Sequence, residues 1–362
     1  MNRTHTWTGR ADGPGDEHRR FWQIVEPAEA PAAPGNRATA DPTRPGGPAA
    51  DAVILGFASD EGVRRNHGRQ GAAAGPEAIR AALGSLAAHS PLRVVDAGDV
   101  VVAGEDLESG QADLARQIAE LRRSPGLSEA LTGVLGGGHE TAWGSYLGLA
   151  EECADRRLGI LNLDAHFDLR QAERPTSGTP FGQVAADRAA RGADFDYTVI
   201  GISEANNTTA LFDTARELGV TWLNDVDSQD VARAVRWVEE FAAGVDDLYL
   251  TIDLDVLPAA VAPGVSAPAG FGVPTAVILA ACGAAAASGK LRHFDVVELN
   301  PRYDVDGRTA RTAARLVHEI LTRAAAERSA GSPVCASGRP AADVRRRTAD
   351  GGNTTPVTPR TV

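Results

Sequence analysis

The sequence predicts an α/β protein of three layers, in which a central, mainly parallel sheet of about eight strands lies between two layers of helices. The first observation is an alternation: short apolar runs rich in β-branched residues are followed by longer runs with helical spacing. The second is the composition, with 43% hydrophobic and 23% charged residues, which is ordinary for a protein with a sizeable buried core. Together they indicate a sheet that helices cover on both faces.

The expected strands follow one another through most of the chain. In order they are AVILGFA from Ala52, RVVDAGDV from Arg93, LTGVLGG from Leu131, LGILNLD from Leu158, YTVIGI from Tyr197, VTWLN from Val220, LYLTIDLDV from Leu248 and FDVVELN from Phe294. The expected helices include PEAIRAALGSL from Pro76, DLARQIAELRR from Asp113 and DVARAVRWVEEFAA from Asp230. In open sheets of this kind ligands bind beyond the carboxyl ends of the strands, so polar residues that follow a strand are the candidates for function.

The two ends of the chain differ from its middle. Residues 28–50 are crowded with Pro, Ala, Gly and Thr and show no periodicity, which predicts a flexible linker. Residues 329–362 have few large apolar side chains and are expected to form a disordered tail. The folded body is therefore expected to span residues 51–328, with residues 1–27 as a separate N-terminal segment.

Charge and cysteine content exclude several classes of protein. The net charge of -12 disfavours nucleic-acid binding, which needs a basic surface to neutralise phosphates. Cys153, Cys282 and Cys335 are an odd number without paired ligand spacing, so neither a disulfide framework nor a zinc site is indicated, and we expect a cytoplasmic protein. No apolar signal region is found and no apolar run reaches the roughly 18 residues of a membrane helix, so neither export nor membrane insertion is expected.

The most informative segment is LGILNLDAHFDLR, in which Asp164, His166 and Asp168 stand at alternate positions after an apolar strand. Side chains at alternate positions of an extended chain point to one side, so two carboxylates and an imidazole can converge on one cation. The plainer interpretation is that these are polar groups that cap a loop at the end of the strand.

Two further segments carry polar residues after strands. LYLTIDLDVL ends in Asp253 and Asp255, and because unpaired buried carboxylates are costly, these residues indicate a cation or a metal unless the strand end is exposed. In TGVLGGGHETAWGSYLG, three glycines precede His139 and Glu140, and a helix follows. His139 is there either a ligand or only a residue at the start of the helix.

The three segments together offer two imidazoles and four carboxylates, a set that suits manganese better than zinc. GGGHE, DAHFD and TIDLDVL, in this order, resemble the metal motifs of the arginase-like ureohydrolase superfamily. The resemblance implies the arginase-like fold and two Mn2+ ions per chain. It assigns one ion to His139, Asp164, Asp168 and Asp253, and the other to Asp164, His166, Asp253 and Asp255.

The resemblance also implies a reaction. Water shared by two cations loses a proton near neutral pH and can attack the carbon of an amidine-type substrate. Asp168 would orient this water and carry a proton after the attack. Glu298, in VVELNP, matches the acidic residue that holds the cationic nitrogen of the substrate in the superfamily, and its plainer interpretation is a surface carboxylate at a strand end.

Other segments resemble one branch of the superfamily, the formimidoylglutamases of histidine degradation. They are WTGRADG from Trp7, ASDEGVRRNHGRQGAAAGPEAIRAAL from Ala58, DLR from Asp168, SGTPFGQ from Ser177, VAPGVSAPAG from Val261 and NPRYDVDGRTARTAARLVHEI from Asn300, and they span most of the ordered chain. This resemblance implies manganese-dependent hydrolysis of N-formimidoyl-L-glutamate to L-glutamate and formamide. Because WTGRADG precedes the linker, residues 1–27 are expected to dock on the body.

The same resemblance gives candidates for contact with a small amidine substrate. They are Arg170, Asn66, Arg69, Ser177 and Phe181. Arg170 stands where arginases carry an Asn, and a guanidinium forks naturally onto a carboxylate, of which formimidoylglutamate has two. Alternatively, Arg170 faces solvent or pairs with Glu173, and the basic run of Arg64, Arg65, Asn66 and Arg69 is a solvated loop.

Phe181 marks a departure from the arginases, which carry a proton-shuttling His at this position. Another group must then protonate the leaving amine, and the sequence leaves Asp168, Glu140 and His67 as alternatives. An agmatinase or another guanidino-acid ureohydrolase that releases urea is the alternative function. A metal-binding protein without catalysis is the alternative from another class. The resemblance also implies a homo-oligomer, a trimer or hexamer.

Overall fold

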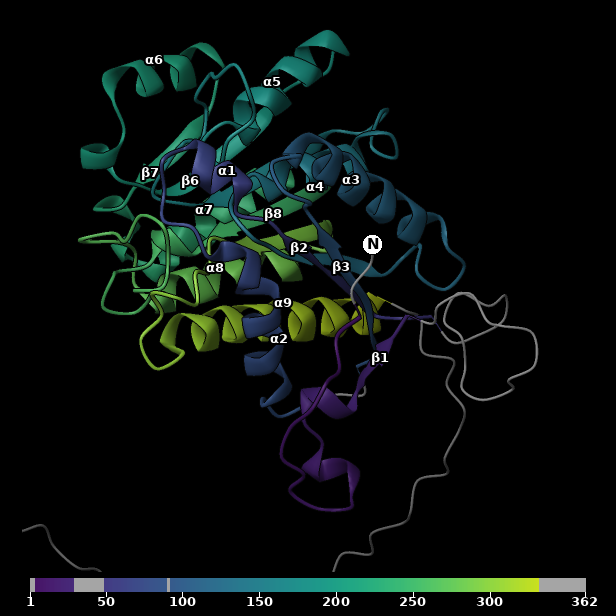
Figure 1. Ribbon diagram of the computed structural model, residues 1–362. Coiled ribbons are helices and arrows are strands. Elements are labelled where there is room, and N and C mark those ends of the chain that lie inside the picture. The colour runs from purple at the N-terminus through teal and green to yellow at the C-terminus, as the bar shows by residue number, and fades with distance from the viewer. Residues whose placement is uncertain (1–3, 29–48, 90–91, 332–362) are drawn as a thin grey trace, which may run out of the picture.

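The computed structural model describes residues 4–28, 49–89 and 92–331 of the 362-residue chain. Within these ranges one nine-stranded sheet runs through the middle of the molecule (Figure 1), and all its paired strands are parallel. The strands are β1 (Val25–Pro27), β2 (Ala52–Ala58), β3 (Val94–Val101), β4 (Leu131–Leu135), β5 (Leu158–Leu163), β6 (Asp196–Ile202), β7 (Thr221–Asn224), β8 (Asp247–Asp253) and β9 (Leu291–Val297). Their order across the sheet is β1-β3-β2-β4-β9-β8-β5-β6-β7.

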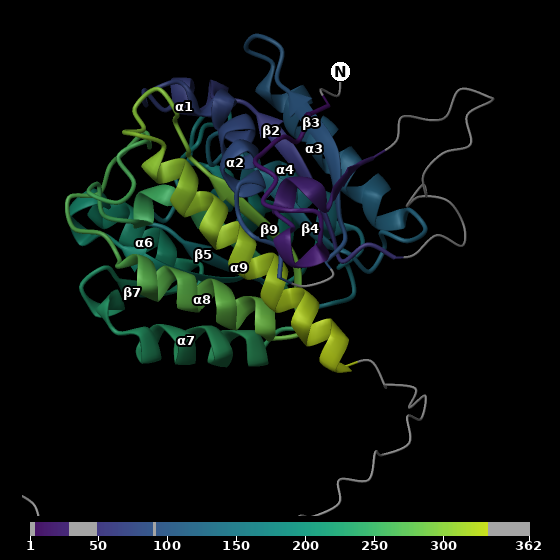
Figure 2. The same cartoon turned by 90° about the horizontal axis from the view of Figure 1, so that it is seen from below.

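Helices cover both faces of this sheet. They are α1 (Glu61–Arg65), α2 (Gly75–Gly84), α3 (Leu107–Arg123), α4 (Thr141–Ala150), α5 (Pro180–Ala190), α6 (Thr209–Glu217), α7 (Val231–Ala243), α8 (Thr275–Ala287) and α9 (Arg308–Gly331). Short 3-10 turns lie at Asp16–His18, Phe21–Gln23, Ala72–Ala74, Glu204–Asn206, Asp227–Gln229 and Leu254–Val256. Helices α2, α9, α8 and α7 pack side by side in one layer (Figure 2), and α3, α4 and α5 pack in the other. The predicted three-layer α/β/α class is confirmed.

The sheet has one strand more than the eight predicted. The added strand, β1, is three residues long and pairs at the sheet edge with β3, in the register Val25↔Val94. Its last residue is Pro27, which lacks an N–H donor and is tolerated only where a ladder is incomplete, as on an edge strand. Such a short segment has no apolar run from which it could be recognised.

The central strands provide the core that holds the site. Every residue of β4, β5 and β8 is buried, as expected of parallel strands that are covered on both faces. The side chains that follow these strands therefore start from rigid backbone. No helix within the described ranges is both long and apolar enough to cross a membrane.

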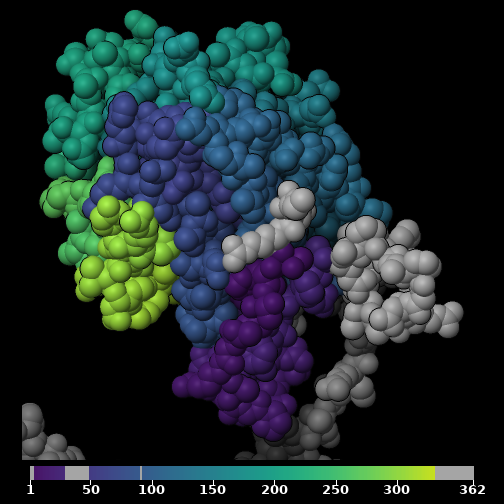
Figure 3. All heavy atoms as spheres, viewed as in Figure 1, coloured from purple at the N-terminus to yellow at the C-terminus, as the bar shows by residue number. Residues whose placement is uncertain are grey.

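The N-terminal segment lies against the body (Figure 3). The indole Nε1 of Trp7 donates to Asp96 Oδ2 (2.7 Å), and the fully buried Arg80 donates to the same carboxylate (2.9 Å). Phe21 N donates to the carbonyl of Leu86 (2.8 Å). These contacts and the pairing of β1 with β3 attach residues 4–28 to the sheet edge.

The predicted linker and tail fall mostly on residues that the structure does not describe. Residues 29–48 and 332–362 lie outside the described ranges. Helix α9, however, continues to Gly331, so the boundary predicted at residue 329 differs from the observed helix end by three residues. The helical spacing of α9 continues further than its small side chains indicated.

Candidate active site

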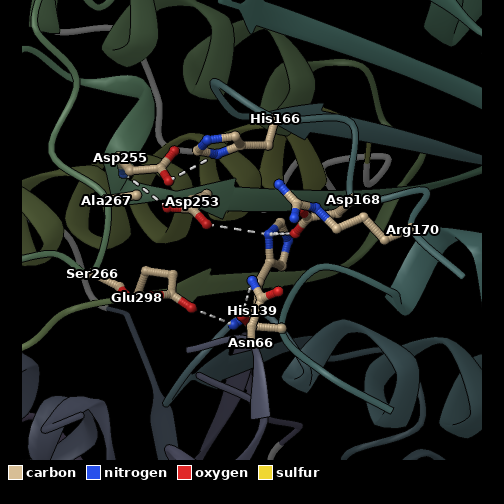
Figure 4. Close-up of a pocket in the computed structure, with 11 residues that line it drawn as sticks. Asn66, His139, His166, Asp168, Arg170, Asp253, Asp255, Ser266, Ala267 and Glu298 are labelled. Carbon is tan, nitrogen blue, oxygen red and sulfur yellow. Dashed lines mark hydrogen bonds and ion pairs between the residues drawn. The ribbon is translucent and has the colours of Figure 1, made fainter. Parts of the chain in front are cut away.

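The polar motifs meet at the carboxyl ends of four strands that are neighbours in the sheet, β4, β9, β8 and β5. His139 follows β4 and Glu298 follows β9. Asp253 ends β8, Asp255 lies in the 3-10 turn after it, and Asp164, His166 and Asp168 follow β5. Except for Asp164, which is fully buried, these side chains line one cavity, as Figure 4 shows. Residues separated by more than a hundred positions in the chain are thus brought together because parallel strands end at the same edge.

His139 faces three carboxylates with one ring nitrogen. Its Nδ1 lies 3.2 Å from Asp164 Oδ2, 3.0 Å from Asp168 Oδ2 and 3.2 Å from Asp253 Oδ2. The other ring nitrogen, Nε2, lies 3.0 Å from Thr251 Oγ1. Thr251 therefore fixes the orientation of the ring, and a metal ligand with one ring nitrogen bound to a hydroxyl or carboxylate is a common arrangement.

His166 forms the second part of the cluster. Its Nδ1 lies 3.1 Å from Asp255 Oδ2 and 3.5 Å from Asp164 Oδ1. Two groups of ligand atoms are close enough to hold a cation each: His139, Asp164 and Asp253, and Asp164, His166 and Asp255. Asp164 belongs to both groups, as expected of a bridging carboxylate.

The donor set fits metal ions. The buried Nδ1 of His139 has no hydrogen-bond partner, although three carboxylates surround it. Burial, followed by repulsion from Asp255 and Asp164, raises the pKa of Asp253 well above its usual range. Buried carboxylates this close are costly to ionise unless cations lie among them. The cluster thus has the excess negative charge and the free ligand atoms that two divalent cations require.

Glu298 also lines the cavity, beside the two groups of candidate ligands. Its Oε1 accepts a hydrogen bond from His139 N (2.9 Å), and its Oε2 is buried without a partner. Burial, followed by repulsion from Glu140, raises the pKa of Glu298 to about 8. A cationic group bound beside Oε2 would stabilise the ionised carboxylate and reverse this shift.

Two of these residues have unusual backbone conformations. Asp168 (φ 49°) and Glu298 (φ 70°) lie in the left-handed region, which costs a residue with a side chain about 1–3 kcal/mol in such places. Glu298 is held there by a hydrogen bond from its N–H to the carbonyl of Gly137 (2.8 Å), and Phe181 N donates to the carbonyl of Asp168 (3.2 Å). Strained residues of this kind cluster at functional sites, where the surrounding fold fixes them.

The mouth of the cavity carries hydrogen-bond donors. Asn66, Arg170 and Ser177 line it, and Asn66 Nδ2 donates to Ser177 Oγ (3.1 Å). The Arg170 side chain points into the cavity (Figure 4), and its guanidinium forms no hydrogen bond or ion pair with the described residues. In particular, the structure has no pair between Arg170 and Glu173. The cavity thus combines an acidic floor with the unpaired guanidinium of Arg170 at its mouth.

Two other predicted contact residues lie outside the cavity lining. The guanidinium of Arg69 is used by the carbonyls of Ser266 (3.0 Å) and Val265, and it lies over the ring of Tyr303, 4.2 Å from its centroid. Arg69 therefore holds a loop in place. Phe181 is fully buried, with its ring edge-on to His139 at 5.3 Å between centroids. It packs behind a candidate ligand instead of facing the substrate.

The three alternative proton donors also differ in position. Asp168 lines the cavity, whereas Glu140 and His67 do not. Glu140 is completely buried, with Oε1 accepting from Ser59 Oγ (2.9 Å) and Gly62 N (3.0 Å), and burial raises its pKa to about 7. His67 is exposed and lies two residues after the end of helix α1, in a left-handed conformation (φ 60°). Only Asp168 of the three is in contact with the space that a substrate would occupy.

The sequence analysis did not identify all residues of the site. Thr251 stands two positions before Asp253, so the same alternation that paired Asp253 with Asp255 also places Thr251 on that face. Ser266 and Ala267 line the cavity, but they lie in a loop whose sequence carries no charge to mark it. The signal for Thr251 was therefore present in the alternation of the strand, and that for the loop lay only in the resemblance of VAPGVSAPAG, from Val261, to the formimidoylglutamases.

Comparisons with known proteins agree with this arrangement. The family model described as "Arginase family" matches residues 50–322. Among curated proteins, formimidoylglutamases from Nocardia farcinica and Rhodococcus jostii are 54% and 52% identical over 322 residues, which cover 88% of this chain and 96% and 95% of theirs. A solved structure of a Trypanosoma cruzi formiminoglutamase with Mn2+ superposes with a TM-score of 0.69 at 26% identity and covers 76% of this chain and 94% of that one. The chain therefore belongs to the arginase family.

Proposed function

We propose that the protein hydrolyses N-formimidoyl-L-glutamate to L-glutamate and formamide, a step of histidine degradation. Water adds its oxygen to the formimidoyl carbon, and the bond from this carbon to the glutamate nitrogen breaks. The leaving nitrogen takes up a proton and departs as the amino group of glutamate, and the formimidoyl group becomes formamide. The free guanidinium of Arg170 above an acidic cavity floor is the observation that carries this proposal.

The proposal includes two Mn2+ ions per chain. His139, Asp164, Asp168 and Asp253 would hold one ion, and Asp164, His166, Asp253 and Asp255 the other. The two ligand groups found in the structure support most of this assignment, although Asp253 belongs to only one of them and Asp168 to neither. Asp168 Oδ2 lies 3.0 Å from His139 Nδ1, beside the first group. Bound there, a pair of divalent cations supplies a water that is deprotonated near neutral pH.

The protein's own residues position the amidine and move protons. Glu298 would accept a hydrogen bond from the cationic amidinium through Oε2, the oxygen that has no partner within the described residues. Asp168, which lines the cavity, would orient the attacking water and pass a proton to the leaving nitrogen. The positions of Glu140 and His67 outside the lining support Asp168 over these alternatives.

The carboxylates of the substrate would be held at the cavity mouth. The Arg170 guanidinium would donate to one carboxylate, and Asn66 and Ser177 lie beside it as neutral donors. Agmatine has no carboxylate and would bring an ammonium group toward Arg170, which is unfavourable. This difference in charge favours formimidoylglutamate over a guanidino substrate.

Further parts of the proposal concern the setting of the enzyme. A homo-oligomer, a trimer or hexamer, is proposed from the family resemblance, and size-exclusion chromatography with light scattering tests it. A cytoplasmic location is proposed from cysteine usage, since Cys153 and Cys282 are both buried and free. Cys335 lies outside the described residues.

The decisive experiment is a substrate panel on manganese-loaded protein with identification of the products. We expect formamide and glutamate from formimidoylglutamate, at a kcat/KM far above that for arginine, agmatine or guanidino acids. Release of urea from a guanidino substrate at higher efficiency would replace the proposal by a guanidino-acid ureohydrolase. A protein that binds manganese but turns over no member of the panel would be a metal-binding protein without catalysis.

A further inference from the structure

Arg65, the last residue of helix α1, uses all five of its N–H donors. Nε donates to Glu61 Oε1 (2.8 Å), and the terminal nitrogens donate to both oxygens of Glu108 (2.9 Å each) and to the carbonyls of Pro175 (3.0 Å) and Glu105 (2.7 Å). The side chain is only 7% exposed. A buried guanidinium is costly unless its hydrogen bonding is this complete, so these contacts hold Arg65 in one position.

The acceptors of Arg65 belong to three segments of the chain. They come from α1, from the turn that begins α3, and from the loop of residues 169–179, called the rim loop here. In the rim loop the acceptor is Pro175, which lies between Arg170 and Ser177, two residues that line the cavity. Arg65 itself does not line the cavity, so its influence on the site can pass only through these segments.

Arg65 also fixes Asn66, a second residue that contacts the rim loop. Asn66 follows it directly and donates to Ser177 Oγ (3.1 Å). A Cβ atom added to Gly178 would lie 3.0 Å from Arg170 Cδ and 3.3 Å from Asn66 Nδ2. The three donors are therefore packed closely around this glycine, and a small shift of the rim loop would displace them from the positions that a bound carboxylate requires.

Arg174, also in the rim loop, provides an internal comparison. It contacts both oxygens of Glu108 at 3.2 Å, but its side chain is 52% exposed. Exposed ion pairs of this type contribute little. The hydrogen bonds from Arg65 are the main reason why the pKa of Glu108 falls to about 2. The two arginines also share the carbonyl of Glu105 as an acceptor, at 2.7 Å from Arg65 and 3.3 Å from Arg174. They differ in burial, which makes Arg174 a matched control.

We propose that Arg65 is a positioning residue for substrate specificity: by tying the rim loop to α1 and α3, it holds Arg170, Asn66 and Ser177 in the arrangement that receives a substrate carboxylate. The inference rests on the proposed function, because it takes these three residues to be the carboxylate site. The sequence analysis left two interpretations for the basic run that contains Arg65, a solvated loop or direct contact with the substrate. The proposed role of Arg65 differs from both, because Arg65 acts through the residues that it holds in place.

Arg65→Lys tests the proposal, because an ammonium group is a point charge that cannot reach all three segments at once. In manganese-loaded protein we expect KM for formimidoylglutamate to rise about tenfold while kcat changes less than about threefold. In an Arg170→Ala background the same substitution should change kcat/KM less than about twofold, because the main group that it positions is gone. Arg174→Lys, the control, should change kcat/KM less than about twofold.

Equal losses from Arg65→Lys in both backgrounds, or an Arg174→Lys effect as large as that of Arg65→Lys, would overturn the proposal. If Arg65→Lys does not fold, Glu108→Gln weakens the same anchor and should give the same pattern. A second readout needs no turnover: amide hydrogen exchange of residues 171–178 in manganese-loaded, substrate-free protein should be faster in Arg65→Lys than in the wild type. Unchanged hydrogen exchange would refute the proposal that Arg65 holds the rim loop in place. Lack of formimidoylglutamate turnover by the wild type would instead refute the proposed function.

Discussion

His139 and Thr251 are joined by a hydrogen bond of 3.0 Å between the imidazole Nε2 and the threonine Oγ1. Because Thr251 occupies the Nε2 side, the Nδ1 side faces the three carboxylates of the cluster. The hydrogen bond to Thr251 therefore holds the imidazole of His139 in one orientation.

The first prediction follows from this hydrogen bond. Thr251→Val keeps the shape of the side chain but removes the partner of Nε2, so the affinity for the manganese ion held by His139 should fall roughly 10- to 100-fold. Isothermal titration calorimetry on metal-free protein measures this affinity. Thr251→Ser keeps a hydroxyl and should bind nearly as the wild type does. Wild-type affinity in Thr251→Val would mean that packing alone, including that of Phe181, orients the ring.

The second prediction concerns the bridging carboxylates. Asp164 belongs to both ligand groups and Asp255 to one, so Asp164→Ala should lose both manganese ions and Asp255→Ala mainly one. Asp253→Ala should resemble Asp164→Ala if Asp253 also bridges. Metal analysis of reconstituted, desalted protein gives the number of ions per chain. One ion retained by Asp164→Ala, or a single ion in the wild type, would contradict the dinuclear site.

The third prediction concerns Glu298. Glu298→Gln keeps an oxygen that can accept from His139 N but removes the charge that would hold the amidinium. A hydrogen bond to a charged group is worth about 1.5–3 kcal/mol, so kcat/KM should fall roughly 10- to 150-fold while both metals stay bound. Glu140→Gln is the matched control, since Glu140 is equally buried but lies outside the lining. Near-normal turnover by Glu298→Gln would leave Glu298 only a structural role.

The fourth prediction separates the possible substrates. Arg170→Ala should lower kcat/KM for formimidoylglutamate roughly 10- to 150-fold, because one charge-assisted hydrogen bond to a carboxylate is lost. The slow turnover of agmatine should stay the same or improve, since a repulsive charge is removed. Steady-state kinetics at fixed manganese compare the two. An unchanged rate with formimidoylglutamate, or a wild-type preference for agmatine, would exclude the assigned role of Arg170.

The fifth prediction concerns the stability of the metal-free protein. Burial is the main cause that raises the pKa values of Asp253, Asp255 and Glu298, the last to about 8. A carboxyl group with a raised pKa in the folded state contributes stability at low pH that is lost as the pH rises through that pKa. Around His166, attraction by Asp255 and Asp164 outweighs burial and raises its pKa, and this stabilisation is likewise lost at higher pH.

Metal-free protein should therefore melt at a lower temperature as the pH rises from about 5 to about 8, and manganese should raise the Tm more at pH 8 than at pH 5. Asp164 acts in the opposite direction, since its pKa is lowered by His139 and His166 despite its burial, but it is one group against several. Thermal melts of chelator-treated and manganese-loaded protein at each pH provide the comparison. A manganese effect that is independent of pH would contradict this electrostatic account.

The fold could be predicted where the local pattern determines structure. Strands such as β5 and β8 are mainly apolar, which is typical of parallel strands that are buried on both faces. The strand β1 could not be predicted, because three residues, Val25–Pro27, gain their ladder only from a partner about seventy positions later. Helix α3 begins at Leu107, before the predicted start at Asp113, because Asp106 caps it through Ser109 N.

The candidate site could be predicted where residues share a strand end. Asp164, His166 and Asp168 needed only the alternation of an extended chain to be placed together. The residues at the mouth of the cavity were harder to predict, because they lie in loops. Arg69 and Arg170 look alike in sequence. The guanidinium of Arg69, however, donates to carbonyls of a loop almost two hundred positions away, whereas that of Arg170 has no partner within the described residues. Only the tertiary structure distinguishes a structural arginine from one available to a ligand.

The strand order has a consequence for the synthesis of the protein. Strand β9 is the last of the sheet to be made, and it inserts between β4 and β8, in the middle of the sheet. While the chain emerges from the ribosome, the ends of β4 and β8 therefore lack the strand that joins them, and Glu298 arrives only with it. Non-local pairing of this kind forms late in folding. Metal loading should accordingly follow release of a nearly complete chain, and shortened chains that lack β9 should accumulate as metal-free intermediates.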